Sequence, residues 1–253
     1  MGERTFTEES RDVAAPAGAD AALRGLLDAA SAPYRKAGRF AFHFARGKLA
    51  ADPVYRGILE LGLLQRHRRI LDLGCGQALL SAWLVAAARC YEYGTWPRDW
   101  PPPAQSPAVR GIELMPRDVA RARGALGDAC EVIQADIRAA PFGSADAVVI
   151  LDVLHYIDAQ SQREVLERVH AALPPGGLLL LRVGDAAGGL RFRITAYADM
   201  LPMLFRGHGF VATHCRSVQE WRQLLGECGF DSEATPMSHG TPFANVLLIA
   251  HTR

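Results

Sequence analysis

The segment "RILDLGCGQA" (Arg69 to Ala78) holds the residues of this chain whose types and spacing best suit ligand chemistry. Apolar, strand-favouring residues lead into the acidic Asp72, and the glycines Gly74 and Gly76 follow it. Glycine permits a tight turn and leaves the backbone bare, so that a ligand can approach it closely. A helical pattern, "LLSAWLVAAA", begins directly afterwards, and its N-terminus would face the ligand. The segment therefore predicts a strand, a turn and a helix that hold a ligand together.

Three further predicted strands also end in polar residues. Glu113 closes the strand in "VRGIELMP", Asp136 closes "EVIQADI", and the strand in "DAVVILDVLHYI" has a polar exit. Ligands of open α/β sheets bind beyond the carboxyl ends of the strands, so these groups would gather at one edge. A carboxylate accepts two hydrogen bonds and suits a vicinal diol. The series predicts an adenosine-type cofactor on a doubly wound sheet.

Predicted strands and helices alternate along the chain, which indicates βαβ units and a parallel sheet. The expected strands are residues 69–73, 108–114, 131–137, 147–151 and 178–183, with a final pair in "SEATPMS" and "ANVLLIAHT". The expected helices are residues 79–88, 116–126 and 161–173, with one more in "SVQEWRQLLGECGF". The fold class is therefore α/β, with a doubly wound, mostly parallel sheet and an N-terminal helical extension.

The chain divides into three parts. Residues 1–18 are polar or rich in Ala, Gly and Pro, and we expect a flexible N-terminus. Residues 19–66 are expected to form a helical cap, and residues 67–253 the main domain with insertions at 91–107 and 185–215. The second insertion follows the fifth strand, so we expect it to cover the ligand site.

Composition excludes several classes of function. The net charge of +1 over 253 residues gives no global field that would recruit nucleic acid or an acidic membrane. No apolar run approaches the roughly 20 residues of a membrane span, and the polar N-terminus is unlike a signal peptide. The five scattered cysteines match no metal-site spacing and predict reduced thiols. We expect a soluble, cytoplasmic protein without a metal site or a nucleic-acid substrate.

The glycine turn, the acidic strand ends and the closing strand pair resemble the class I S-adenosylmethionine-dependent methyltransferases, from about Ile70 to the C-terminus. The resemblance implies a Rossmann-like, seven-stranded sheet with S-adenosyl-L-methionine as cofactor. It implies that the turn receives the methionine part, Glu113 both ribose hydroxyls, and Asp136 the adenine amino group. The cofactor-binding candidates are Asp72, Gly74, Cys75, Gly76, Glu113, Leu114, Asp136, Ile137 and Asp152.

Two features depart from the family pattern. Ala78 occupies the third glycine of Gly-x-Gly-x-Gly, and we expect a mild effect because it adds one methyl group. The interval from Gly76 to Glu113 is 37 residues, where about 20 is usual, and the insertion at 91–107 accounts for the excess. A nicotinamide-dependent Rossmann enzyme is the less favoured alternative, because its fingerprint needs a glycine where Leu79 stands.

Methyl transfer requires that the acceptor be positioned against the sulfonium and, for some acceptors, that a general base nearby remove its proton. His155 is the first catalytic candidate because it follows the fourth strand, and Tyr156 and His43 are reserves. Structural interpretations stay open: the His155 ring could shape the turn in "LHYID", and His43 could pack within "FAFHF". The acidic strand-end residues could likewise be ordinary caps.

The exit of the fourth strand, "LDVLHYID", lacks the Asn/Asp-Pro-Pro-Tyr/Phe element of nucleobase-amine methyltransferases and resembles small-molecule members. We therefore predict O-methylation of a phenol, an enol or a carboxylic acid. The segments "ILDVLHYID", "LRVGDAAGGLRFR" and "GTPFANVLL" also resemble bacterial methyltransferases of aryl-polyene and fatty-acid-like pathways. That resemblance implies an acceptor carried by an acyl carrier protein, whose acidic surface would meet the basic cap. The competing function is a catalytically silent, methyltransferase-like binding module.

Overall fold

Seven strands of the structure, a computed structural model that describes residues 19–184, 214–237 and 245–253, form one sheet in the order β3-β2-β1-β4-β5-β7-β6. The strands are β1 Arg69–Leu73, β2 Ala108–Glu113, β3 Glu131–Gln134, β4 Ala147–Leu151, β5 Leu178–Gly184, β6 Phe230–Pro236 and β7 Asn245–Thr252. Strands β1 to β5 are parallel, whereas β7 runs antiparallel between β5 and β6. The predicted α/β fold is therefore confirmed, including the antiparallel closing pair.

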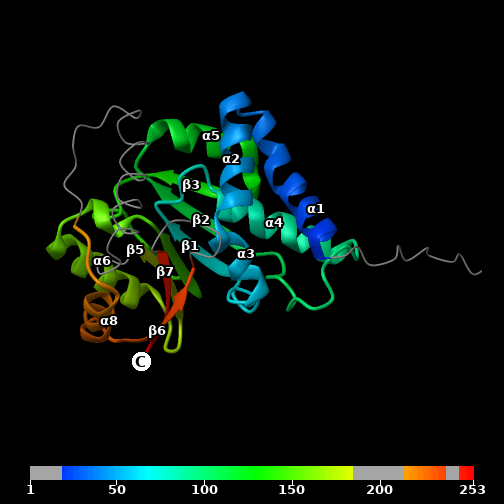
Figure 1. The fold of residues 1–253 in the computed structure, drawn as a ribbon. Helices are drawn as coiled ribbons and strands as arrows, with labels where there is room; N and C mark the ends of the chain where they lie inside the picture. Colours follow the sequence, from blue (N-terminus) through cyan, green and yellow to red (C-terminus); the bar gives the residue numbers. More distant parts are fainter. Residues whose placement is uncertain (1–18, 185–213, 238–244) are drawn as a thin grey trace, which may run out of the picture.

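Helices cover both faces of this sheet (Figure 1). They are α1 Ala19–Ser31, α2 Arg39–Ala51, α3 Pro53–Glu60, α4 Leu79–Glu92, α5 Pro116–Leu126, α6 Ala159–Ala172 and α8 Val218–Glu227, with short 3-10 helices η1 Ala32–Arg35, η2 Gly127–Ala129 and η3 Leu154–Tyr156. Alternate strand residues enter different cores: Val149 of β4 packs with α1 to α4, and Val148 packs with α6 and α8. No helix among the described residues is long and apolar enough to cross a membrane.

The helical cap α1–η1–α2–α3 is joined to the sheet by hydrogen bonds as well as by apolar packing. The Tyr34 hydroxyl of η1 donates to the Gln77 carbonyl in the glycine turn at 2.7 Å. The Trp83 indole of α4 donates to the Tyr55 carbonyl of α3 at 2.8 Å. Both aromatic side chains are buried, so the cap shares one core with the sheet. The glycine turn thus lies directly beneath η1.

Several element boundaries differ from those predicted. Helix α6 starts two residues early because the Asp158 carboxylate accepts from the Gln160 and Ser161 backbone amides. Helix α4 continues to Glu92, and so enters the predicted insertion at 91–107. The rest of that insertion is a packed loop, in which the Trp96 and Trp100 rings meet edge to face at 5.6 Å.

Other predictions fall on parts of the chain that the structure leaves undescribed. The expected flexible N-terminus, residues 1–18, lies outside the described residues, as do residues 185–213 of the second insertion. The division into a cap and a main domain stays a prediction.

Candidate active site

The glycine turn between β1 and α4 is shaped by two glycines with different tasks. Gly74 has a φ of +72°, and a Cβ there would lie 2.3 Å from a methyl group of Val153. Its amide donates to the Ile112 carbonyl at 2.8 Å, which fixes the turn against β2. Gly76 has a φ of +56°, and a Cβ there would meet no atom of the described residues within 4 Å. Gly74 is therefore needed for packing, whereas Gly76 faces open space.

Ala78 has a backbone conformation that glycine, the residue of the family pattern, would adopt more easily. It caps α4 with φ +58° and ψ +43°, the left-handed region that L-residues other than Asn and Asp rarely enter. That conformation costs roughly 1–2 kcal/mol for a residue with a Cβ. The predicted mild effect of the added methyl group stays a prediction, and the structure adds this backbone cost to it.

Two acidic strand ends lie together at this turn. The Glu113 carboxylate accepts from the Gly76 and Met115 amides, each at 2.8 Å, and so clamps the turn to the end of β2. Asp72 is only 4% exposed, and no described residue donates a hydrogen bond to its carboxylate. Burial, with a smaller contribution from the neighbouring Glu113 charge, raises the pKa of Asp72 to about 7. The turn thus places a buried acid with unused acceptor capacity beside an open backbone.

The remaining turn and strand-end candidates differ in what they can offer a ligand. The Cys75 sulfur packs against Gly111 of β2, so closely that a Cβ on Gly111 would lie 2.5 Å from it. Burial raises the pKa of this thiol. Ile137 is buried in the core beside α6. Leu114 is 53% exposed directly after Glu113. Leu114 therefore offers a side chain to a ligand, whereas Cys75 does not, and its amide already donates to the Ile112 carbonyl at 3.2 Å.

Asp136 is already engaged within the chain. The Arg138 guanidinium donates to both carboxylate oxygens, the shortest contact being 2.6 Å, and the Arg138 amide donates at 2.9 Å. The side-chain hydrogen bonds from Arg138 lower the pKa of Asp136. An adenine amino group would therefore have to share this carboxylate with Arg138. The sequence "ADIR" shows the arginine, which the prediction did not weigh.

A buried ion network beyond β4 and β5 was missed by the sequence prediction. Arg182, 1% exposed in β5, donates from Nε to Asp152 at 2.9 Å and from Nη2 to Asp52 at 2.8 Å. Lys48 of α2 pairs with Asp52 at 2.7 Å. Burial would raise the pKa of Asp52, but the Arg182 charge and hydrogen bonds hold it well below its usual range. Asp152, predicted to bind cofactor, is thus tied to the cap.

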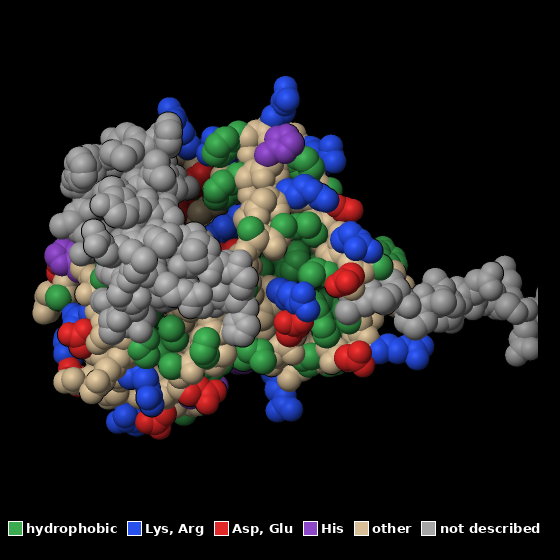
Figure 2. Space-filling view, in the orientation of Figure 1, with side chains coloured by type: hydrophobic (Ala, Val, Ile, Leu, Met, Phe, Trp, Pro, Cys, Tyr) green, Lys and Arg blue, Asp and Glu red, His purple; other side chains and the backbone are tan. Residues whose placement is uncertain are grey.

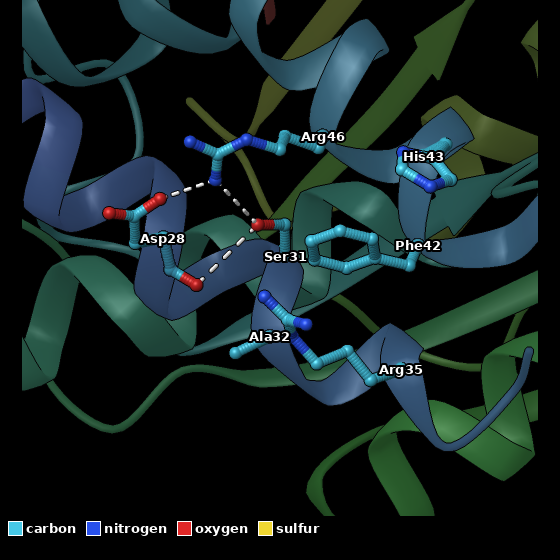
Figure 3. Close-up of a pocket in the computed structure, with 7 residues that line it drawn as sticks. All are labelled: Asp28, Ser31, Ala32, Arg35, Phe42, His43 and Arg46. Carbon is cyan, nitrogen blue, oxygen red and sulfur yellow. Dashed lines mark hydrogen bonds and ion pairs between the residues drawn. The ribbon is translucent and has the colours of Figure 1, made fainter. Parts of the chain in front are cut away.

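His155 and Tyr156 lie together in η3, with ring centroids 4.0 Å apart. Burial lowers the pKa of His155, against the opposing charge of Asp152, so the imidazole is neutral at pH 7. His43 is elsewhere: it lines a pocket of the cap with residues of α1, η1 and α2 (Figure 3). The structure therefore brings together two of the three catalytic candidates.

Figure 2 shows a hollow beside α2 where acidic, basic and hydrophobic side chains meet. The residues that end β1, β2 and β4 converge at the same edge of the sheet, since these strands are parallel neighbours. Among the described residues no group of three or more His, Cys, Asp or Glu side chains could hold a metal ion. The described site therefore consists of hydrogen-bonding groups of the protein, namely the backbone of the open glycine turn and the buried acidic side chains beside it.

Known proteins resemble this chain in sequence and in fold. A family model described as a methyltransferase domain matches residues 41–235. A carboxy-S-adenosyl-L-methionine synthase of Chromohalobacter salexigens is 36% identical over 140 residues, which are 51% of this chain and 47% of that protein. The chain thus matches about half the length of this curated relative.

Two solved structures illustrate the similarity of fold. Mitomycin 7-O-methyltransferase is 20% identical, with a TM-score of 0.59 over 83% of this chain and 56% of that one. Human N-acetylserotonin methyltransferase, solved with S-adenosylmethionine, is 19% identical, with a TM-score of 0.58 over 89% of this chain and 59% of that one. The predicted family and cofactor are confirmed, and the chain belongs to the S-adenosylmethionine-dependent methyltransferases of the methyltransferase-domain family.

Proposed function

We propose that this protein transfers the methyl group of S-adenosylmethionine to an oxygen of a small molecule: a phenol, an enol or a carboxylic acid. The observation that carries the proposal is the glycine turn, where Gly76 faces open space beside a buried Asp72 and a clamped Glu113. A turn of this kind admits a ligand to the backbone and offers carboxylates to its polar groups.

The residues present fit the cofactor. Asp72 would accept from its ammonium group, because a buried carboxylate gains most from a cationic partner. Glu113 has two carboxylate oxygens with lone pairs beyond those used by the two amides, and these would accept from ribose hydroxyls. The exposed Leu114 would pack on the adenine ring. When bound, the cofactor supplies an electrophilic methyl group on a positively charged sulfur.

The acceptor would be deprotonated by His155. Its half-buried, neutral imidazole can take the hydroxyl proton of a phenol, an enol or an acid, and the nearby Asp152 charge would stabilise the resulting imidazolium. Tyr156, whose ring contacts His155, would orient the acceptor. Arg182 would keep Asp152 in place. His43 lies outside this group, so we assign it no part in proton transfer.

The first experiment is calorimetric titration with S-adenosylmethionine, followed by mass spectrometry of reactions with a panel of phenols, enols and carboxylic acids. Release of S-adenosylhomocysteine with an acceptor heavier by one methylene unit supports the proposal. Tight binding without turnover on any acceptor would favour the silent binding module.

A second candidate function comes from the relatives named carboxy-S-adenosyl-L-methionine synthases. The same mass spectra separate the two functions, because that activity would give carboxy-S-adenosyl-L-methionine and no methylated acceptor. A carboxylated cofactor would need a cation to pair with its added carboxylate. The buried Arg182 already donates to Asp152 and Asp52, which favours methyl transfer.

Two narrower expectations belong to the proposal: a cytoplasmic location, and delivery of the acceptor on an acyl carrier protein. The cap segment 29–51 contains five Lys and Arg residues and no acidic residue, which suits an acidic partner. Comparing turnover of one acceptor, free and tethered to a carrier protein, at low and high salt tests the delivery. Salt-independent turnover that does not depend on the carrier would reject it.

A further inference from the structure

A second cavity lies in the helical cap, apart from the glycine turn. It has a volume of about 560 Å³, within the range of small-molecule sites. Its lining comes from the end of α1, from η1 and from α2, and consists of Asp28, Ser31, Ala32, Arg35, Phe42, His43 and Arg46 (Figure 3). None of these is a cofactor candidate, so the cavity needs its own explanation.

The cavity carries more positive than negative charge. Two guanidinium groups, of Arg35 and Arg46, face one carboxylate, that of Asp28, which leaves a formal charge of +1. Arg46 pairs with Asp28 and also approaches the Ser31 hydroxyl at 3.5 Å. No ion pair of Arg35 occurs among the described residues; its guanidinium carbon lies instead 4.2 Å from the Phe42 ring centroid. Arg35 therefore retains its capacity for an anion.

The cavity is also partly apolar. The half-buried Phe42 ring and the Ala32 methyl group form its wall, and Figure 3 shows Arg46 and Arg35 on opposite sides of the Ser31 and Phe42 side chains. A planar guanidinium donates two parallel hydrogen bonds to a carboxylate. An aromatic ring offers a flat surface on which another ring packs. The lining thus combines a guanidinium group that can bind a carboxylate with an apolar surface that can contact an aromatic ring.

We propose that this cavity binds a small aromatic carboxylate, which acts as an effector of cofactor binding. The carboxylate would draw the Arg35 guanidinium away from the face of Phe42, where it now lies 4.2 Å from the ring centroid, and the ligand ring would take its place on that face, with Arg46 on the other side. A single negative charge matches the net charge of the lining, whereas a phosphate would bring up to two charges and nothing for the apolar wall.

The short helix η1 connects this cavity to the glycine turn. Ala32 and Arg35 line the cavity, and Tyr34 between them donates its hydroxyl proton to the Gln77 carbonyl at 2.7 Å. Gln77 lies next to Gly76, so a ligand that holds Arg35 also biases the position of the turn. This coupling rests on the proposed cofactor site, whereas the binding itself does not.

The test is calorimetric titration of the full chain with benzoate. We expect saturable binding that weakens about tenfold or more in Arg35→Ala, which loses the charged hydrogen bonds. Lys36→Ala is the matched control, because Lys36 is an exposed neighbouring cation outside the cavity, and His155→Gln excludes binding at the acceptor site. No saturable binding, equal weakening in Arg35→Ala and Lys36→Ala, or tighter binding of inorganic phosphate than of benzoate would overturn the site.

The effector role has a separate readout. Saturating benzoate should change the affinity for S-adenosylmethionine at least about twofold in the wild type, and the change should vanish in Tyr34→Phe, which removes the hydroxyl contact to the turn. Benzoate binding without any change in cofactor affinity would reject the effector role. If S-adenosylmethionine does not bind at all, the proposed function fails while the benzoate result still stands.

Discussion

Replacing Gly76 with alanine separates the needs of the fold from those of the cofactor. The residue has a φ of +56°, and its added methyl group would lie more than 4 Å from every neighbouring atom in the described part of the chain. The fold should therefore lose only the cost of a left-handed alanine, about 1–2 kcal/mol, partly offset by about 0.4–1 kcal/mol from a stiffer unfolded chain. A net loss near 1 kcal/mol lowers the melting temperature by about 2–4 °C.

The loss of cofactor affinity in Gly76→Ala should be larger than the loss of fold stability. With the cofactor bound against the turn, the added methyl group would have to fit into space that the cofactor fills, which costs about 1–3 kcal/mol. At about 1.4 kcal/mol per factor of ten, the dissociation constant of S-adenosylmethionine should rise about 5- to 140-fold. Calorimetry measures this constant, and thermal unfolding without cofactor measures the fold.

Gly94→Ala is the matched control. Gly94 has a φ of +71°, and a Cβ there also meets no described residue within 4 Å, but it follows the C-terminal end of α4, away from the turn. Both variants should unfold at similar temperatures, and only Gly76→Ala should bind poorly. Equal cofactor affinity in the two variants would refute the assignment of the turn. Gly74→Val is a poorer test, because its side chain would collide with Val153 and disturb the fold itself.

Four further outcomes follow from the described contacts. Glu113→Ala should weaken S-adenosylmethionine binding at least about tenfold, because the Gly76 and Met115 amides lose charged acceptors of about 1.5–3 kcal/mol each; wild-type affinity by calorimetry would refute the clamp. Asp72 has its pKa raised from 3.8 to about 7, so its stabilising contribution is complete below pH 3.8 and disappears as the pH rises to 7. Cofactor-free Asp72→Asn should therefore gain on wild type by up to about 1.4 kcal/mol per pH unit across that window in urea unfolding, and parallel pH profiles would contradict the burial argument. Arg182→Met leaves two carboxylates without their shared cation and should cost about 3–5 kcal/mol of unfolding free energy, whereas a loss below about 1 kcal/mol would mean that the network contributes little. His155→Gln should lower turnover without changing cofactor affinity, and a pH–rate profile that matches wild type would place the base elsewhere.

The elements and the acidic strand ends could be predicted because each depends on local pattern. Buried parallel strands read as apolar runs, and Asp72 and Glu113 follow such runs directly, so both were placed correctly at the edge of the sheet. The α4 start was equally visible, because the two glycines precede a helical pattern.

What the sequence concealed depends on contacts between distant segments. Arg182 stands alone in the apolar run "LLLLRVG", which signals a buried charge but does not reveal that Asp52, 130 residues away, is one of its partners. His43 was grouped with His155 by residue type, yet α2 turns it toward the cavity lined by α1 and η1. The left-handed backbone of Ala78 had no signal beyond the missing glycine. Pairings across the cap and the sheet require the fold to be known first.

The place of β7 in the sheet sets an order of events during synthesis. Of the seven described strands it is the last to leave the ribosome, yet it lies between β5 and β6 and pairs with β5 at seven positions. Until residues 245–252 emerge, the nascent sheet presents β5 as an open edge, with unpaired backbone groups available to other chains. Because a domain generally folds as a unit, this sheet cannot be completed before β7 has been made, and one edge of the apolar β5 stays unpaired until then. Its yield in cells should accordingly depend on chaperones that shield β5.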